Sequence, residues 1–180
     1  VVEVMGRHCG YLPLMAAVAG GADYVFTPED PAGPGWQDDL AEHLRLGREA
    51  GRRESIVLVA EGAHDRDGNE LSTQLIADTI QERTGEDARV TILGHVQRGG
   101  TPSAYDRWMS TLLGYAAVQE ILASSADDEP VILGVRRNRI TRIPLMKAVH
   151  DTRAVKDLIA AGDYAAAQAS RGSSFSSMVG

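Results

Sequence analysis

The chain has little of what would assign it to a specialised class of protein. Cys9 is its only cysteine, so no disulfide can form within the chain and a reducing, cytoplasmic location is expected. No apolar run approaches the roughly 20 residues that a membrane-spanning helix needs, so we expect no membrane association. Its 18 basic residues are outnumbered by 25 acidic ones, and the net charge of −7 argues against a nucleic-acid-binding protein, which normally carries a basic face.

Several site motifs are absent as well. The sequence contains neither Gly-x-x-x-x-Gly-Lys-Ser/Thr nor Gly-x-Gly-x-x-Gly, so no loop of these kinds cradles a nucleotide. No serine lies in a nucleophile elbow. The run Asp65-x-Asp67-Gly68-Asn69 resembles half of a calcium loop, but the later ligands are missing and a β-turn is expected. No metal site is predicted, because metal-ligand spacing is lacking at His8, His43, His64 and His150.

What is present is typical of a globular α/β protein, with 43% hydrophobic and 24% charged residues. β-Branched apolar runs alternate with helical patterns, which predicts a three-layer sandwich with a largely parallel sheet. The expected strands cover residues 1–4, 24–27, 56–60, 90–93, 131–135 and 139–143. The expected helices cover residues 9–19, 37–51, 72–83, 103–122, 145–161 and 164–168, with Leu12, Met15, Ala16 and Ala19 on one face of the first and Leu40, His43, Leu44 and Leu46 on that of the second.

The length corresponds to one large domain or a lobe and a half. The chain opens inside an expected strand without an initiating Met and closes on Ser-Ser-Met-Val-Gly at 176–180, with no terminating element. We therefore expect it to be a piece of a longer polypeptide.

Reactive side chains follow three of the expected strands. Met5-Gly6-Arg7 follows the first, Glu61 follows residues 56–60, and the segment from His95 to Arg98 follows residues 90–93. The last segment leads through Gly99-Gly100 into a capping box of Ser103 and Asp106. Because the carboxyl ends of parallel strands meet at one edge of a sheet, these side chains are expected to converge on one crevice.

The residue types predict the ligand. Arg7 and Arg98 can fork onto a phosphate, while His95, Gln97 and Glu61 can bond to hydroxyls. The helix that follows the first strand adds amide dipoles that favour an anion. Each residue taken alone also has an ordinary structural interpretation, as a surface arginine, a strand-end carboxylate or a packed histidine. Together they predict a phosphorylated, hydroxyl-rich small molecule.

Arg89 differs from these residues, because it stands at the entrance of its strand. Its side chain is therefore expected far from the carboxyl edge of its own subunit. From there it could reach a site across an oligomer interface.

Three segments resemble 6-phosphofructokinases: residues 2–12 (Val-Glu-Val-Met-Gly-Arg-His-Cys-Gly-Tyr-Leu), residues 59–63 and residues 94–107. The likeness runs in order over nearly the whole chain. It is strongest to the amino-terminal, catalytic half of the long eukaryotic type, because the arginine at the position of Arg98 is usually replaced in the other half. Residues 143–146 and 171–175 resemble segments that lead towards the connector between the halves. Residues 1–180 are thus expected to form the sugar-phosphate-binding part of a catalytic half, with the ATP-binding part upstream.

The resemblance implies roles for individual residues. The implied substrate-binding residues are Met5, Gly6, Arg7, Glu61, Arg89, His95, Gln97 and Arg98. Arg7 is also implied as a catalytic residue that neutralises charge on the transferring phosphoryl group. Arg89 is implied to reach the sugar phosphate of a neighbouring subunit, and Asp23 matches an effector position of bacterial relatives.

The resemblance implies a reaction as well. The parent enzyme would transfer the γ-phosphoryl group of Mg-ATP to the 1-hydroxyl of fructose 6-phosphate in glycolysis. The glycine-rich ATP loop and the Thr-Ile-Asp-Asn-Asp motif, with the catalytic base and a magnesium ligand, would precede Val1, so the isolated chain is expected to be inactive. Three alternatives stay open: a regulatory sugar-phosphate-binding half, a pyrophosphate-dependent phosphofructokinase, and a structural interaction fragment.

Overall fold

The computed structural model describes residues 1–172 and residue 175. Residues 176–180, and Ser173 and Ser174 of the connector-like segment, lie outside the described residues. The chain divides into two compact units. The first contains Val1–Arg98 and the segment that starts at Leu158, and the second contains Gly99–Asp157.

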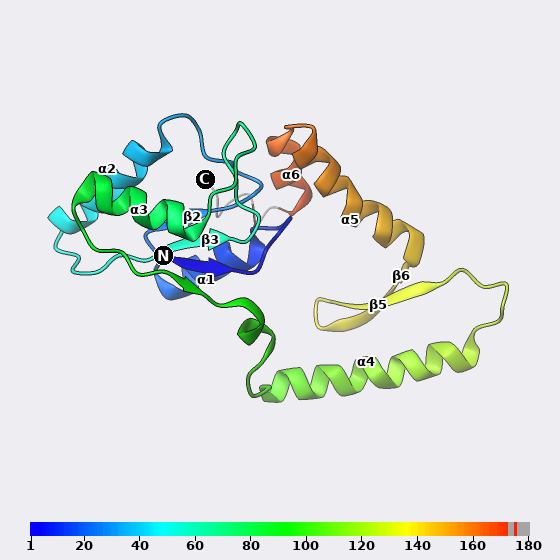
Figure 1. The fold of residues 1–180 in the computed structure, drawn as a ribbon. Helices are drawn as coiled ribbons and strands as arrows, with labels where there is room; N and C mark the ends of the chain where they lie inside the picture. The colour runs from blue at the N-terminus through cyan, green and yellow to red at the C-terminus, as the bar shows by residue number, and fades with distance from the viewer. Residues whose placement is uncertain (173–174, 176–180) are drawn as a thin grey trace. The chain divides into compact units, whose positions relative to one another are not determined.

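A parallel sheet forms the centre of the first unit (Figure 1). Its strands are β1 (Val2–Val4), β2 (Tyr24–Phe26), β3 (Val57–Ala60) and β4 (Thr91–Ile92), in the order β2-β3-β1-β4. β1 pairs in parallel with both β3 and β4, and β2 pairs in parallel with β3. This confirms the predicted parallel sheet, and it places the carboxyl ends of β3, β1 and β4 next to one another.

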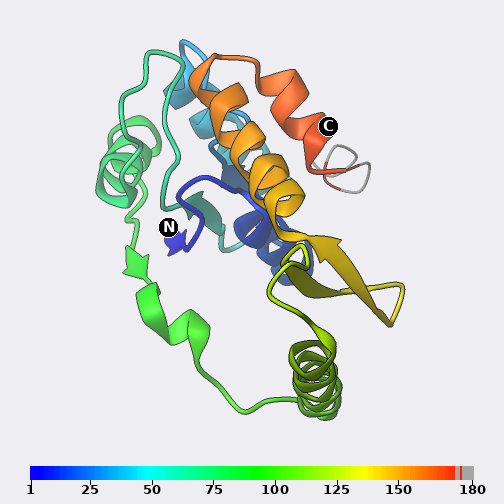
Figure 2. The ribbon, with the colours of Figure 1, turned by 90° about the vertical axis from the view of Figure 1, so that its right-hand side faces the viewer.

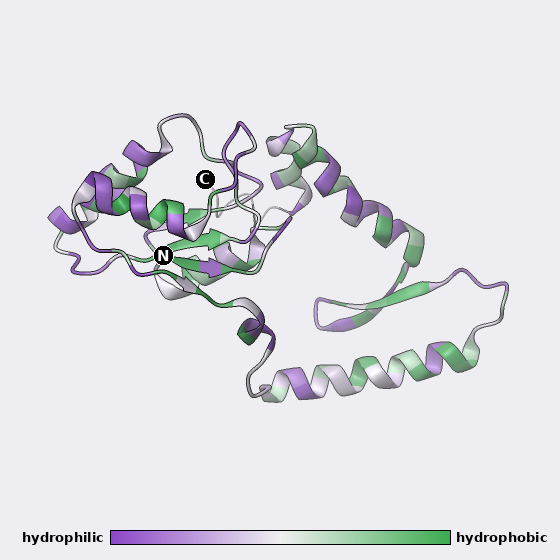
Figure 3. Ribbon diagram, in the orientation of Figure 1, coloured by the Kyte–Doolittle hydropathy of each residue, from purple (hydrophilic) through white to green (hydrophobic). Residues whose placement is uncertain are grey.

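Helices cover both faces of this sheet. α2 (Trp36–Glu49) and α3 (Thr73–Thr84) contact each other and share a core with Val57 and Val59 of β3. Leu58, which points to the opposite face, packs with Ala17 of α1 (Tyr11–Gly20). β3 is buried along its whole length and appears green in the hydropathy view (Figure 3). The predicted three-layer arrangement is therefore confirmed.

The expected packing face of α1 was wrong. Leu12, placed on that face, is 53% exposed, whereas Leu14 and Ala17 are buried. Nearly every residue of α1 is apolar, so the sequence period does not select a face and the contact with the sheet does. In α2, likewise, Leu40 is fully buried but Leu46 is half exposed.

The strand expected at residues 90–93 is shorter and more exposed than predicted. β4 pairs only with β1 at the edge of the sheet, and Ile92 is 62% exposed. A strand at an edge has a neighbour on one side only, so its side chains lose part of their cover. The residues after β4 form a 3₁₀ helix, η1 (Gly94–Arg98), instead of an irregular loop.

The second unit begins with α4 (Ala104–Ala123), whose predicted capping box is present: Ser103 accepts from the backbone of Asp106, and Asp106 accepts from that of Ser103. Next come β5 (Val131–Arg136) and β6 (Arg139–Pro144), which form an antiparallel hairpin (Figure 2). Arg137 and Asn138 make its turn with φ angles of 49° and 62°, as in a type I′ turn.

The last helices are α5 (Leu145–Ala160) and α6 (Tyr164–Ser170). α6 belongs to the first unit, and its N-cap is Asp163, which accepts from the backbone N–H of Ala166. Among the helices of residues 1–172, none is both long and apolar enough to span a membrane.

Candidate functional site

Two hydrogen bonds join the loops that follow β3, β1 and β4. Nη2 of Arg7 donates to Oε1 of Glu61 over 3.2 Å. The backbone N–H of Met5 donates to Oε1 of Gln97 in η1 over 2.8 Å. The loop after β1 is thus bonded to both of its neighbours. The structure brings together these predicted site residues at the carboxyl edge of the sheet.

Glycines allow these loops to pack closely. A Cβ atom at Gly62 would lie 1.9 Å from the carbonyl oxygen of Arg7, and one at Gly6 would lie 2.5 Å from the carbonyl oxygen of Cys9. Both distances are too short for any side chain. The backbone of the β1–α1 loop therefore lies against the β3–α3 loop.

The Arg7–Glu61 pair is solvated, since the Arg7 side chain is 72% exposed and that of Glu61 is 35% exposed. Exposed ion pairs contribute only about 0–1 kcal/mol to stability. Arg7 can therefore exchange Glu61 for a ligand anion at small cost. Beneath the edge, burial raises the pKa of Glu3 on β1, and the negative charges of Glu61 and Glu70 raise it further.

His95 and Arg98 are exposed on η1. Within residues 1–172 and residue 175, their side chains form no hydrogen bond or ion pair. An imidazole and a guanidinium next to the Met5–Gln97 bond are thus available to a ligand. Gln97 uses its carbonyl oxygen for Met5, which leaves its amide nitrogen as a donor.

Arg89 lies away from this edge, as predicted. It precedes β4, and its carbonyl oxygen accepts a hydrogen bond from the amino group of Val1 over 2.8 Å. Together with residues of α2 and α3 it lines a cavity of about 890 Å³. A second cavity, of about 560 Å³, lies beside β2. Neither cavity is lined by Arg7, Glu61 or His95. Both cavities therefore lie elsewhere than the sheet edge where the predicted residues meet.

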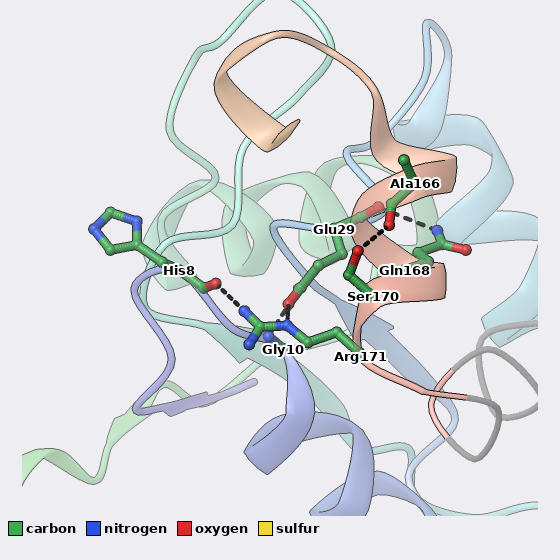
Figure 4. A network of polar contacts seen from close by, with 7 residues as sticks. All are labelled: His8, Gly10, Glu29, Ala166, Gln168, Ser170 and Arg171. Atoms are coloured by element: carbon green, nitrogen blue, oxygen red, sulfur yellow. Dashed lines mark hydrogen bonds and ion pairs between the residues drawn. The ribbon is translucent and has the colours of Figure 1, made fainter. Parts of the chain in front are cut away.

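Sequence reasoning missed a fourth strand end. Glu29 follows β2 and is completely buried. Its Oε2 accepts from the backbone N–H of Gly10 over 2.8 Å, and its Oε1 accepts from Nε of Arg171 over 3.1 Å (Figure 4). Glu29, like Glu61, is a carboxylate that follows an expected strand. The prolines and glycines around it, however, favoured an ordinary loop. Nothing local identifies Arg171, because its partner lies 142 positions away.

The remaining acidic candidates have structural contacts. Asp23, which is nearly buried, accepts from the backbone N–H of Ile56 over 2.8 Å and pairs with Arg52. Asp65 accepts from the backbone N–H groups of Asp67 and Asn69, which confirms the predicted turn. The described part of the chain contains no group of three or more His, Cys, Asp or Glu residues able to hold a metal ion.

The fold and this edge define an α/β protein whose polar side chains gather at the ends of parallel strands, the place where such sheets bind ligands. The family model for phosphofructokinase matches residues 1–121, and the chain belongs to the phosphofructokinase family. It is 47% identical to an ATP-dependent 6-phosphofructokinase of Aspergillus fumigatus, over 97% of this chain and 22% of that protein. It is 44% identical to the liver type of Bos taurus over the same shares. The chain thus spans about a fifth of the length of these relatives.

The chain also resembles solved structures of phosphofructokinases. The phosphofructokinase of Saccharomyces cerevisiae superposes with a TM-score of 0.91 at 43% identity, over 99% of this chain and 24% of that one. A pyrophosphate-dependent phosphofructokinase from Nitrosospira multiformis superposes with a TM-score of 0.67 at 19% identity, over 81% and 39% of the two chains. The second match shows a shared fold alone.

Proposed function

We propose that this chain is the fructose 6-phosphate-binding part of an ATP-dependent 6-phosphofructokinase. The observation that carries the proposal is the meeting of Met5, Arg7, Glu61 and Gln97 at one sheet edge, where two hydrogen bonds join three separate loops. The identity of 44–47% to ATP-dependent enzymes supports the choice of phosphoryl donor. It disfavours the pyrophosphate-dependent alternative, whose structural relative shares only 19% of its residues with this chain.

The chain's own residues would divide the work of binding the sugar. Arg98 and His95, which have no partner among the described residues, would contact the 6-phosphate and the sugar. Glu61 and the amide nitrogen of Gln97 would bond to hydroxyl groups. The backbone of Met5 and Gly6 would lie against the sugar.

Arg7 has a second role in the proposal. Among the described residues, its guanidinium pairs with one exposed carboxylate alone, so it can turn towards an incoming anion. There it would stabilise negative charge on the transferring phosphoryl group, the main contribution an enzyme makes to this chemistry. Arg7 is therefore proposed as the catalytic residue of this chain.

Magnesium and ATP belong to the proposal only through the parent enzyme. When bound there, Mg-ATP would supply the γ-phosphoryl group. We further propose that the parent is an allosteric, cytoplasmic enzyme of glycolysis that assembles as an oligomer. Arg89, which lies at the opposite end of β4 from the site, would serve the sugar-phosphate site of a neighbouring subunit.

A regulatory half is the second candidate. Arg98 and the complete Met5-Gly6-Arg7 motif favour the catalytic half. The test is a chimera in which this chain replaces the matching segment of the Aspergillus fumigatus enzyme. If the chain is catalytic, Arg7→Ala abolishes turnover by the chimera. If the substitution removes only activation by sugar phosphate and leaves basal turnover intact, the regulatory alternative is correct.

Binding is tested on the chain itself by calorimetric titration with fructose 6-phosphate. Fructose and inorganic phosphate serve as matched ligands, because each carries half of the proposed recognition. Tighter binding of fructose 6-phosphate than of either is expected, together with no turnover in a coupled kinase assay with Mg-ATP. Equal or absent binding of all three ligands would support a structural interaction fragment instead.

A further inference from the structure

We propose that Glu29 and Arg171 are positioning residues, which hold the β1–α1 loop in the shape that presents Arg7 to the sugar phosphate. The expected effect on sugar-phosphate binding rests on the proposed function. Outside the predicted site, the buried Glu29 forms an ion pair with the partly exposed Arg171, and the contacts of the two residues join three separate segments of the first unit (Figure 4).

Glu29 is the central residue of this network. It is completely buried, and both of its carboxylate oxygens are used. Oε2 accepts from the backbone N–H of Gly10, directly before α1, and Oε1 accepts from Nε of Arg171. A buried carboxylate needs such partners, because an unpaired charge out of water is strongly unfavourable.

Arg171 extends the network to the β1–α1 loop. While its Nε bonds to Glu29, its Nη2 donates to the carbonyl oxygen of His8 over 2.6 Å. One planar guanidinium thus holds a buried carboxylate and the residue next to Arg7 at the same time. A lysine ammonium is a single point charge and does not reproduce this fork.

The loop also packs closely against the segment that carries Glu29. A Cβ atom at Gly10 would lie 2.5 Å from Cβ of Thr27 and 2.9 Å from Oε2 of Glu29. Gly10 is therefore the residue that lets the loop approach this carboxylate. The approach and the hydrogen bond together hold the end of the loop.

α6 supplies the third segment. Nε2 of Gln168 donates to the carbonyl oxygen of Glu29 over 3.1 Å, and Ala167 is completely buried. Arg171 follows directly after this helix. The carboxyl-terminal helix is thus docked onto the segment that holds the β1–α1 loop.

These contacts attach the loop at both ends. Gln97 holds Met5 at its start, and Glu29 and Arg171 hold His8 and Gly10 at its end. Arg7 lies between, and among the described residues the ion pair that its side chain forms is with the exposed Glu61. The direction of the Arg7 side chain therefore depends on the attachment of its neighbours, which is what makes Glu29 and Arg171 positioning residues.

The experiment uses the 180-residue chain with Arg171→Met, Arg171→Lys and the double variant Glu29→Gln, Arg171→Met. The double variant matters because it removes the buried charge and keeps an oxygen that accepts from Gly10, so it is expected to fold with a thermal midpoint near that of the unaltered chain. Arg153→Met is the matched control: Arg153 is exposed on α5 and forms no hydrogen bond or ion pair within the described residues.

Two quantities are measured. Hydrogen–deuterium exchange of residues 7–9 is followed without ligand, and the affinity for fructose 6-phosphate is measured by calorimetry. In the double variant, exchange of these amides is expected to accelerate and the affinity to fall about tenfold, because the bond from Arg171 to His8 is lost. Arg171→Lys should give intermediate values, and Arg153→Met should change neither quantity.

Unchanged exchange and unchanged affinity in a folded double variant would overturn the positioning role. The two proposals fail separately. If the unaltered chain binds no fructose 6-phosphate, the proposed function of the chain is wrong, while the exchange of residues 7–9 in the ligand-free variants still decides whether Glu29 and Arg171 hold the loop.

Discussion

The guanidinium of Arg7 lies 3.2 Å from the carboxylate of Glu61, and this contact joins the loops that follow two neighbouring parallel strands. Both side chains are reached by solvent. The pair is therefore a weak link that keeps the arginine at the edge of the sheet, and a ligand anion can replace the carboxylate as its partner.

Arg7→Ala should separate binding from stability. Loss of an exposed ion pair is expected to lower the free energy of unfolding by about 1 kcal/mol or less. Loss of a charged hydrogen-bond donor to phosphate is expected to weaken binding of fructose 6-phosphate by about 2 kcal/mol. Denaturant unfolding and calorimetry measure the two effects. Arg45→Ala, which removes another exposed arginine that pairs with glutamates on α2, should leave the affinity unchanged.

Gln97 can be tested with two substitutions that differ in one property. Gln97→Ala removes the acceptor for Met5 and should cost about 1 kcal/mol of stability. Gln97→Glu keeps an acceptor oxygen at the same place, so the stability should be preserved. The added negative charge should nevertheless weaken binding of the anionic sugar severalfold. A Gln97→Glu variant that binds as tightly as the unaltered chain would contradict the placement of Gln97 beside the phosphorylated ligand.

Gly62→Ala should be among the most damaging single-methyl changes in the first unit. The new Cβ would lie 1.9 Å from the carbonyl oxygen of Arg7, so the loop that carries Arg7 has to move. The expected loss is about 2 kcal/mol or more in the free energy of unfolding, with a matching loss of sugar-phosphate binding. Gly20→Ala is the control. It lies at the end of α1 with open space around its Cβ position, and it should be neutral or stabilising.

Glu3 gives the chain a pH-dependent contribution to stability. Burial and the charges of Glu61 and Glu70 raise its pKa in the folded state above the ordinary value of 4.5. A carboxyl group with a raised folded pKa favours folding when protonated, so its contribution is complete below pH 4.5 and is lost as the pH rises through the folded pKa. Glu3→Gln removes the titration, and its stability relative to the unaltered chain should therefore be more favourable at pH 7 than at pH 4.

Unfolding curves at both pH values test this prediction. Glu82→Gln, at an exposed position of α3, provides the control. The relative stability of that variant should show a smaller pH dependence than that of Glu3→Gln. Parallel behaviour of the two variants would contradict the cause assigned to the shift at Glu3.

Much of the fold follows from short-range features of the sequence. The apolar run at residues 56–60 predicted β3, because side chains that alternate between two covered faces must all be apolar. Ser103 and Asp106 marked the start of α4, because a capping box depends on residues only three positions apart. The polar residues at the ends of β1 and β3 were found in the same way, and the parallel sheet then brought them together.

Other features depended on how the elements pack. The buried face of α1 was set by the sheet, because an apolar helix carries no period that selects one side. The exposure of Ile92 came from the position of β4 at the sheet edge. The ion pair of Glu29 and Arg171 joins residues 142 positions apart. The sequence by itself thus determined where the strands lie, the capping box of α4 and the polar residues that follow β1 and β3, since these rest on neighbouring residues. Only the tertiary structure decided which faces are covered and which distant charges pair with each other.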